Sequence, residues 1–214
     1  MEEQPVNIPC PICNISGEVF MIAHVEEIPY FGEHTQVTVM CHSCGWRQTD
    51  FIPAEGKKAG GWSIVVGSTD ILSARVIRSS SCTVKVHELD LEVAPGSNAT
   101  GYVSNIEGVL NRFKDIIQMV LRDMESEVTM LKSAQPVDSD ALTQGVESVA
   151  KLLEMLDRIE NAGQDGAEPL TVELLDPHGL SMIMHDDAAE RDLSEDELLL
   201  LPVGPDPAVF SPDD

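Results

Sequence analysis

Residues 10–44 read CPICNISGEVFMIAHVEEIPYFGEHTQVTVMCHSC and contain four of the five cysteines of the chain. These cysteines form two C-x2-C pairs, Cys10 with Cys13 and Cys41 with Cys44, and 27 residues separate the pairs. Tetrahedral zinc prefers four thiolates, and each C-x2-C turn supplies two of them on one side of the ion. The spacing therefore predicts a zinc ribbon, in which a β-hairpin joins two cysteine turns that hold one Zn²⁺.

Four thiolates complete a tetrahedron and leave no open coordination position, so the predicted zinc is structural rather than catalytic. A rubredoxin-like iron centre and a redox-active C-x2-C pair are alternative interpretations of the same cysteines. Cys82 has no partner in the sequence and lies in a strand-like run, so we expect a small buried residue there.

The rest of the chain has a mainly β pattern with one helical interruption. The predicted strands are 19–22, 36–40, 62–66, 83–87, 89–93, 170–175 and 180–184. From Ser104 to about Lys132, and again from Leu142 to Ile159, apolar residues recur every three or four positions. Ser104 and Glu107 have the spacing of a capping box, and the short link at 135–138 predicts an antiparallel helical hairpin.

These patterns predict a zinc ribbon at 1–52, a β domain at 53–184 and an acidic segment at 185–214, with the helical hairpin inserted at about 104–162. Residues 151–214 carry 17 acidic and 3 basic side chains, more than half of the excess acid of the chain. Like charges at this density oppose compaction, so we expect residues 185–214 to form a mobile acidic tail or a solvated last layer.

The charge of the whole chain disfavours nucleic acid as a partner. The sequence has 13 basic and 37 acidic side chains, a formal net charge of −24, and residues 1–50 contain one basic side chain, Arg47. Phosphate contacts supply most non-specific affinity, so a nucleic-acid-associated zinc ribbon is the less favoured alternative. The acidic surface suits a basic protein partner, or adaptation to high intracellular salt.

Catalytic motifs do not accompany the cysteines. The six histidines contain no His-x-His pair, and the sequence has neither a G-x-S-x-G motif nor a Walker loop. His87, in a strand, and His178, in a turn, are expected to be surface or structural residues. We expect no enzymatic activity, and a β-barrel enzyme is the remaining, less favoured alternative.

The sequence also predicts a cytoplasmic location. The acidic start of the chain does not resemble a signal peptide, and no run approaches the roughly 18 apolar residues of a membrane helix. Two close cysteine pairs and a single cysteine fit a reducing compartment better than a disulfide framework.

Three aromatic residues near the cysteines, Tyr30, Phe31 and Trp46, stand out in a chain with 4% aromatic residues. Aromatic side chains anchor protein partners, which makes all three candidate partner-binding residues. A small metal ribbon also needs apolar side chains beside its metal, so they are equally candidates for its core. The apolar helical faces are expected to face the core, with methionines such as Met119 and Met130 as fillers.

Several short segments combine into a more specific pattern. They are IPYFGE at 28–33, CHSCGWR at 41–47, ELDLEV at 88–93, residues 100–108 with IEG at 106–108, and LLDPHGLS at 174–181. In this order, over roughly residues 8–184, they resemble the ZPR-type zinc-finger family. The DPHG turn is usually followed by Asn in that family, whereas this chain has Leu180.

The resemblance implies a zinc ribbon followed by a double-stranded β-helix domain with an inserted helical hairpin. Eukaryotic members carry two such modules and this chain shows one, as in archaeal relatives. Members of the family bind other proteins, among them translation elongation factor one-alpha, whose folding they assist. The resemblance therefore implies a zinc-binding protein-interaction module that is a partner or folding assistant of this GTPase.

Overall fold

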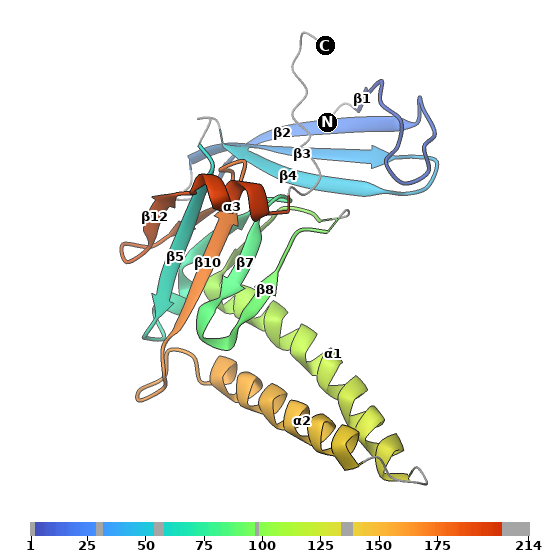
Figure 1. The fold of residues 1–214 in the computed structure, drawn as a ribbon. Helices are drawn as coiled ribbons and strands as arrows, with labels where there is room; N and C mark the ends of the chain where they lie inside the picture. The colour runs from blue at the N-terminus through green and yellow to red at the C-terminus, as the bar shows by residue number, and fades with distance from the viewer. Residues whose placement is uncertain (1–2, 29–31, 54–57, 97–98, 134–138, 203–214) are drawn as a thin grey trace.

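The computed structural model describes residues 3–28, 32–53, 58–96, 99–133 and 139–202. It contains a four-stranded ribbon sheet, a β domain of two sheets, and a helical hairpin that projects from the β domain (Figure 1). The expected class, mainly β with an inserted α-hairpin, is confirmed. No helix in the described ranges is long and apolar enough to cross a membrane.

The ribbon is an antiparallel sheet in the order β1-β2-β3-β4. Its strands are β1 (Gln4–Pro5), β2 (Val19–Ile28), β3 (Gly32–Cys41) and β4 (Arg47–Pro53). Val19, Val37 and Val39 lie on one face and are buried together with Cys10 and Cys41. Alternation of apolar residues along β3 thus forms a small core that includes two of the four paired cysteines.

The β domain has a five-stranded sheet, β12-β5-β10-β7-β8, and a three-stranded sheet, β11-β6-β9. The strands are β5 (Gly60–Val66), β6 (Arg75–Arg78), β7 (Thr83–Val86), β8 (Leu91–Val93), β9 (Tyr102–Asn105), β10 (Leu170–Asp176), β11 (Met182–Met184) and β12 (Ala189–Asp192). The main core contains fully buried side chains from both sheets, among them Ile64, Val76, Leu174 and Ile183. Along central β10 the alternate residues Leu170, Val172 and Leu174 join the main core, and Leu175 on the opposite face joins a smaller apolar cluster.

The hairpin consists of α1 (Ile106–Ser133) and α2 (Ser139–Glu160) and is inserted between β9 and β10. The predicted capping box at Ser104 is wrong, because Ser104 belongs to β9 and the helix begins after Asn105. The side chain of Asn105 accepts a hydrogen bond from the Gly108 amide at 2.8 Å, which satisfies one free donor of the first turn. The predicted link at 135–138 lies outside the described residues.

Only the base of the hairpin packs into the β domain. Phe113 and Ile117 of α1 and Ile159 of α2 join the main core, but the two helices then extend beyond the sheets (Figure 1). Several apolar side chains are consequently exposed, and the expectation that all of them face the core is wrong. They are Ile116, Met119, Val120 and Met130 of α1, and Val146 and Leu153 of α2.

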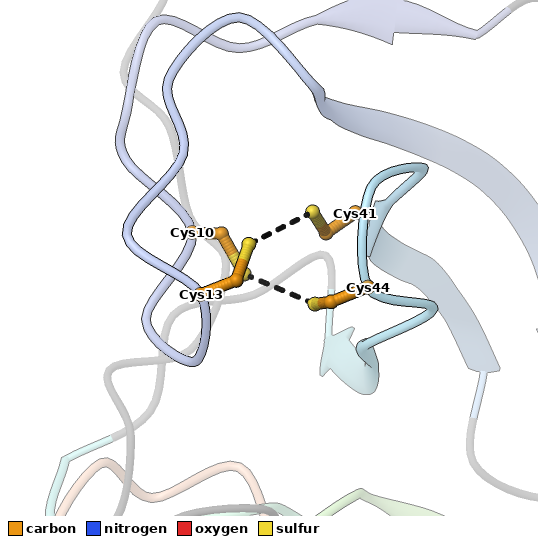
Figure 2. Close-up of side chains that lie close together, drawn as sticks. All are labelled: Cys10, Cys13, Cys41 and Cys44. Carbon is orange, nitrogen blue, oxygen red and sulfur yellow. Dashed lines mark hydrogen bonds between the residues drawn. The ribbon is translucent and has the colours of Figure 1, made fainter.

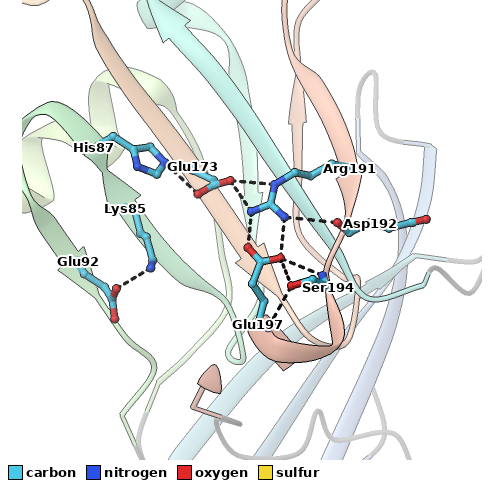
Figure 3. Close-up of polar contacts among 8 residues, drawn as sticks. All are labelled: Lys85, His87, Glu92, Glu173, Arg191, Asp192, Ser194 and Glu197. Carbon is cyan, nitrogen blue, oxygen red and sulfur yellow. Dashed lines mark hydrogen bonds and ion pairs between the residues drawn. The ribbon is translucent and has the colours of Figure 1, made fainter. Parts of the chain in front are cut away.

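The predicted end of the β domain at residue 184 is also too early. β12 pairs antiparallel with β5, and the short helix α3 (Glu195–Leu200) follows it. Arg191 of β12 holds this segment in place, because its guanidinium donates to Glu173 of β10 at 2.8 Å and to Glu197 of α3 at 2.7 Å (Figure 3). Residues 185–202 thus form a solvated last layer of the domain, and residues 203–214 lie outside the described ranges.

A buried polar junction joins the two sheets of the β domain. Asp176, at the end of β10, is 1% exposed and accepts hydrogen bonds of 2.6–2.7 Å from the hydroxyls of Ser79, Ser81 and Ser181. Two backbone amides of the turn after Asp176 also donate to it, one to each carboxylate oxygen. One of them belongs to Leu180, so this contact does not depend on the side chain at that position.

The same serine turn holds the ribbon. Asp50 of β4 is fully buried and accepts hydrogen bonds from the amide and the hydroxyl of Ser80, both at 2.8 Å, and from the side chain of Gln48 at 3.2 Å. Burial raises the pKa of Asp50, the Ser80 and Gln48 hydrogen bonds oppose this shift, and the negative charge of Asp176 adds to it. Two carboxylates from different parts of the fold therefore meet across one turn of three serines.

The hydrogen-bond pattern predicts that Asn is tolerated less well at position 176 than at position 50. In Asp176→Asn, the new amide must face a backbone N–H, which cannot reverse its role, so we expect a loss of about 1–3 kcal/mol of stability. In Asp50→Asn, the new amide can face the Ser80 hydroxyl and the Gln48 side chain, which can both accept, so we expect a change below about 1 kcal/mol. Urea unfolding measures both, and a larger loss for Asp50→Asn would contradict the assigned roles.

The contact between Arg191 and Glu197 predicts an acid-sensitive contribution to stability. The hydrogen bonds from Arg191 and then from the Ser194 amide lower the pKa of Glu197 from 4.5 to about 2. Its ionised form therefore stabilises the fold above pH 4.5, and this contribution is lost as the pH falls towards 2. For Glu197→Gln we expect a loss below about 1 kcal/mol at neutral pH, because the pair is solvent-exposed, and no loss near pH 2.

Thermal unfolding between pH 2 and pH 7 tests this prediction. Glu195→Gln, on the exposed surface of the same helix, is the matched control and should not show this pH-dependent difference. A difference between wild type and Glu197→Gln that stayed constant over the whole pH range would contradict the assignment.

Candidate metal centre

The four paired cysteines converge at one end of the ribbon (Figure 2). The Sγ atoms of Cys10 and Cys44 are 3.7 Å apart, those of Cys13 and Cys41 are 3.8 Å apart, and all four lie within 4.8 Å of one another. A tetrahedral ion with metal–sulfur bonds of about 2.3 Å requires sulfurs about 3.8 Å apart. The predicted ligand set is thus brought together at the spacing that a zinc-sized ion needs.

Each cysteine pair lies on a tight turn that closes with a left-handed residue. The carbonyl of Cys10 accepts from the amide of Asn14, whose φ is 57°, and the carbonyl of Cys41 accepts from the amide of Gly45, whose φ is 76°. Glycine adopts such φ values without strain, and asparagine tolerates them better than most residues. The residue that follows each C-x2-C pair therefore allows both sulfurs to point to the same side of the turn.

The electrostatics of the cluster favour a bound cation. Burial would raise the pKa of Cys10, but the amides of Cys13 and Ile12 and the neighbouring thiols lower it to about 7. The Trp46 amide and burial act in opposite directions on the pKa of Cys44, and the three other thiols help to raise it to about 12. Four sulfurs this close cannot all be thiolates unless a positive ion compensates them.

A metal held by these residues would have a structural role. Four protein ligands fill a tetrahedron, and Cys10 and Cys41 are buried in the ribbon core. When bound, the ion would supply the cross-link between the two turns that the small ribbon core cannot supply alone.

Cys82 lies apart from this site. It is fully buried in the main core of the β domain, and burial raises its pKa to about 12, which keeps it a neutral thiol. This agrees with the expected small buried residue.

The histidines are spread over the fold. The imidazole of His87 contacts Glu173 at 2.9 Å beside Arg191 (Figure 3), and His178 lies in the turn after β10. Among the described residues, the four cysteines form the only group of three or more potential metal ligands.

The three candidate partner-binding aromatics differ in what the structure shows. Trp46 is partly buried and packs against the ribbon core, and its indole N–H has no hydrogen-bond partner within the described part of the chain. Tyr30 and Phe31 lie outside the described residues. Trp46 thus packs beside the metal site, and a role of Trp46 in partner binding stays a prediction.

Sequence reasoning missed the polar residues that the fold gathers around the serine turn and the start of α1. They are Arg78, the serines at 79–81, Tyr102 and Arg112. The run of three serines directly before Cys82 was the one local signal, since such a run is unusual between two strands.

The fold and the site define a class: a four-cysteine ribbon joined to a two-sheet β domain with an inserted helical hairpin. A model of the ZPR1 jelly-roll domain matches residues 70–198. A ZPR1-like protein of Pyrococcus horikoshii is 36% identical over 196 residues, which cover 92% of this chain and 80% of the relative. A ZPR1-like protein of Methanocaldococcus jannaschii is 34% identical over 202 residues, which cover 94% of this chain and 92% of the relative.

The chain therefore belongs to the ZPR1 family, and the β domain expected as a double-stranded β-helix is the family's jelly roll. A more distant relative is the zinc finger chaperone zpr1 of Schizosaccharomyces pombe, 26% identical over 188 residues. The match covers 86% of this chain and 36% of the yeast protein.

The metal centre predicts about one zinc per purified chain, measured by elemental analysis. Cys13→Ala should lose the zinc, because three thiolates leave the tetrahedron incomplete. Cys82→Ala is the matched control and should retain the zinc, since Cys82 lies in a separate core. Iron with a visible absorption band, or full zinc content in Cys13→Ala, would contradict the zinc assignment.

Proposed function

We propose that this protein is a zinc-stabilised protein-interaction module that binds translation elongation factor one-alpha and assists its folding. The ribbon metal would stabilise the module rather than carry out chemistry, since four thiolates leave no position for a substrate. Membership of the ZPR1 family and the name of the yeast relative, a zinc finger chaperone, support this proposal.

The observation that carries the proposal is the uncovered apolar surface of the hairpin. On α1, Met119 is 53% exposed and Met130 is 71% exposed, although α1 already buries another face against the β domain and α2. Exposed apolar patches on a folded protein mark interaction sites, and methionine adapts to irregular partner surfaces. A folding assistant needs such a surface, because its client exposes apolar residues before it is folded.

The distribution of charge supports the same partner class. The net charge of −24 attracts a basic surface over distances of about a Debye length, roughly 8 Å at physiological salt. A GTPase that handles RNA has basic surfaces, so electrostatic attraction would speed its encounter with this chain.

Affinity capture from a native lysate tests the proposal, and we expect the elongation factor among the reproducible partners. Replacement of both Met119 and Met130 by Ser should weaken its capture by about tenfold or more, because apolar anchors dominate interface energies. Glu125→Ser, on an exposed position of the same helix, is the matched control and should capture normally.

Absence of the elongation factor from reproducible captures would overturn the partner assignment. Equal capture by the Met119/Met130 double variant would overturn the role of the hairpin surface. Refolding of the purified elongation factor with and without this protein then measures folding assistance directly.

A further inference from the structure

A pocket of about 370 Å³ lies between residues 93–96 and 99–102 on one side and the first turns of α1 on the other. Its walls are largely apolar and include Val93, Val109, Phe113 and Ile116. Its polar side chains are Thr100, Tyr102 and two arginines, Arg78 and Arg112. A volume of this size accommodates one or two amino-acid side chains or a small ligand.

Arg78 is a buried cation without a carboxylate partner. It is 6% exposed, and its guanidinium donates to the carbonyls of Cys82 at 2.7 Å and Thr100 at 3.3 Å. None of the ion pairs formed by the described residues includes it. Carbonyl dipoles hold the guanidinium in place, but a direct carboxylate contact, which would stabilise a buried cation more strongly, is absent among the described residues.

Arg112 brings a second cation to the same place. Its guanidinium carbon lies 4.1 Å from the centre of the Tyr102 ring, and that of Arg78 lies 5.8 Å from it. Burial raises the pKa of Tyr102, and the two arginines oppose the shift, so its hydroxyl remains a neutral donor. Three side chains that can donate hydrogen bonds to an anion thus line one pocket.

The acidic groups of the described residues do not line this pocket. No Asp or Glu is among its described lining residues, although the chain has a net charge of −24. The nearby buried carboxylates, Asp50 and Asp176, receive their hydrogen bonds from serines, Gln48 and backbone amides, and the described ion pairs do not join either of them to Arg78. Among the described residues that line the pocket, the charged side chains are therefore both cationic, and the two carboxylates lie behind them, hydrogen-bonded to the serine turn.

We infer that this pocket binds a carboxylate of a polypeptide partner, next to an apolar side chain that packs on Phe113 and Ile116. A guanidinium matches a carboxylate in planar geometry, and the apolar walls match a hydrophobic neighbour of that carboxylate. The inference rests on the proposed function, because it names what the protein partner would present.

The surface around the pocket favours a polypeptide over a small free acid. Ile116 lines the pocket and is also exposed, and the exposed side chains of Met119 and Val120 follow it on the next turn of α1. The apolar surface thus continues out of the pocket along the helix, further than a small molecule reaches. A peptide can fill the pocket with one residue and cover this stripe with its neighbours.

Titration of the isotope-labelled full chain with short peptides, followed by amide NMR shifts, tests the inference. The probes are acetyl-Leu-Phe-Asp-amide, with a side-chain carboxylate, and acetyl-Leu-Phe with a free terminal carboxylate. Acetyl-Leu-Phe-Asn-amide and acetyl-Leu-Phe-amide are their neutral counterparts. We expect saturable shifts at Tyr102, Arg112 and Val93 with at least one acidic probe, and binding about tenfold weaker for its neutral counterpart.

Arg112→Gln removes one cation from the exposed side of the pocket and leaves buried Arg78 in place. This substitution should weaken the binding of the acidic probe by about tenfold, which is the effect of losing a charged hydrogen bond. Arg122→Gln, an exposed arginine further along α1, is the matched control and should leave binding unchanged. Unchanged positions of the other amide signals establish that both variants are folded.

Three results would overturn the inference. They are equal binding of acidic and neutral probes, equal weakening by Arg112→Gln and Arg122→Gln, and no shift in the pocket at millimolar concentrations of any acidic probe. A control with phenylpropionate separates the two sources of a carboxylate. If it binds in the pocket and the peptides do not, the site takes a small acid and the peptide assignment is wrong.

Lysate capture with Arg112→Gln distinguishes this inference from the proposed function. If wild type and Arg112→Gln capture the elongation factor equally, the proposed function stands and the pocket is not part of it. If neither captures it but the acidic peptides bind wild type, the pocket stands and the partner assignment fails.

Discussion

The carboxylate of Asp176 and the serine turn at 79–81 form the contact on which the arrangement of the whole β structure depends. The turn connects β6 of the three-stranded sheet to β7 of the five-stranded sheet, and Asp176 ends β10 just before the chain crosses to β11 of the other sheet. Two crossings between the sheets therefore meet at one carboxylate. Through Ser80 and Asp50, the same turn also fixes the last strand of the ribbon. A buried carboxylate tolerates few alternative geometries because each oxygen needs its donors, so this junction holds the two sheets of the β domain and the last strand of the ribbon together.

Much of the fold could be predicted from the sequence where the signal is local. The C-x2-C turns carry their ligands within four residues, and the helical period of α1 and α2 is visible in 20 to 30 residues. What failed depended on distant partners. β12 is exposed along its whole length and has no apolar alternation, so only its pairing with β5 makes it a strand. Met119 and Met130 follow the helical pattern, but periodicity does not show whether a second surface covers them.

At the start of α1, two neighbouring residues were candidates for the N-cap position. Ser104 and Asn105 are both good capping residues, and the Ser104–Glu107 spacing favoured the first of them. Pairing of β9 with β6 keeps Ser104 in the strand, opposite Val76, and continues to Asn105 opposite Arg75. The strand ends at Asn105 and the helix begins at Ile106, so Asn105, the residue directly before the helix, provides the cap. Sheet pairing, which is not visible in the local sequence, decided between two equally suitable side chains.

Counting charged residues along the sequence also fails to show which charges the fold brings together. Residues 51–100 have five acidic and five basic side chains and thus no net charge, and the fold buries one of these, Arg78. From other parts of the chain, the fold brings Arg112 onto the ring of Tyr102, and it places Asp50 and Asp176 in hydrogen bonds with serines. A pocket lined by two arginines thus forms in an acidic protein, although no segment of the sequence is basic. The two fields act on a partner in different ways. The acidic exterior attracts any basic surface without orienting it. Buried Arg78 and exposed Arg112 instead favour one arrangement, in which a carboxylate next to an apolar residue reaches α1. The acidic exterior would therefore attract a basic partner at long range, and the two arginines would select a carboxylate of that partner at short range. Because the two sets of charges lie in different places, a protein with a net charge of −24 can have a site for an anionic group.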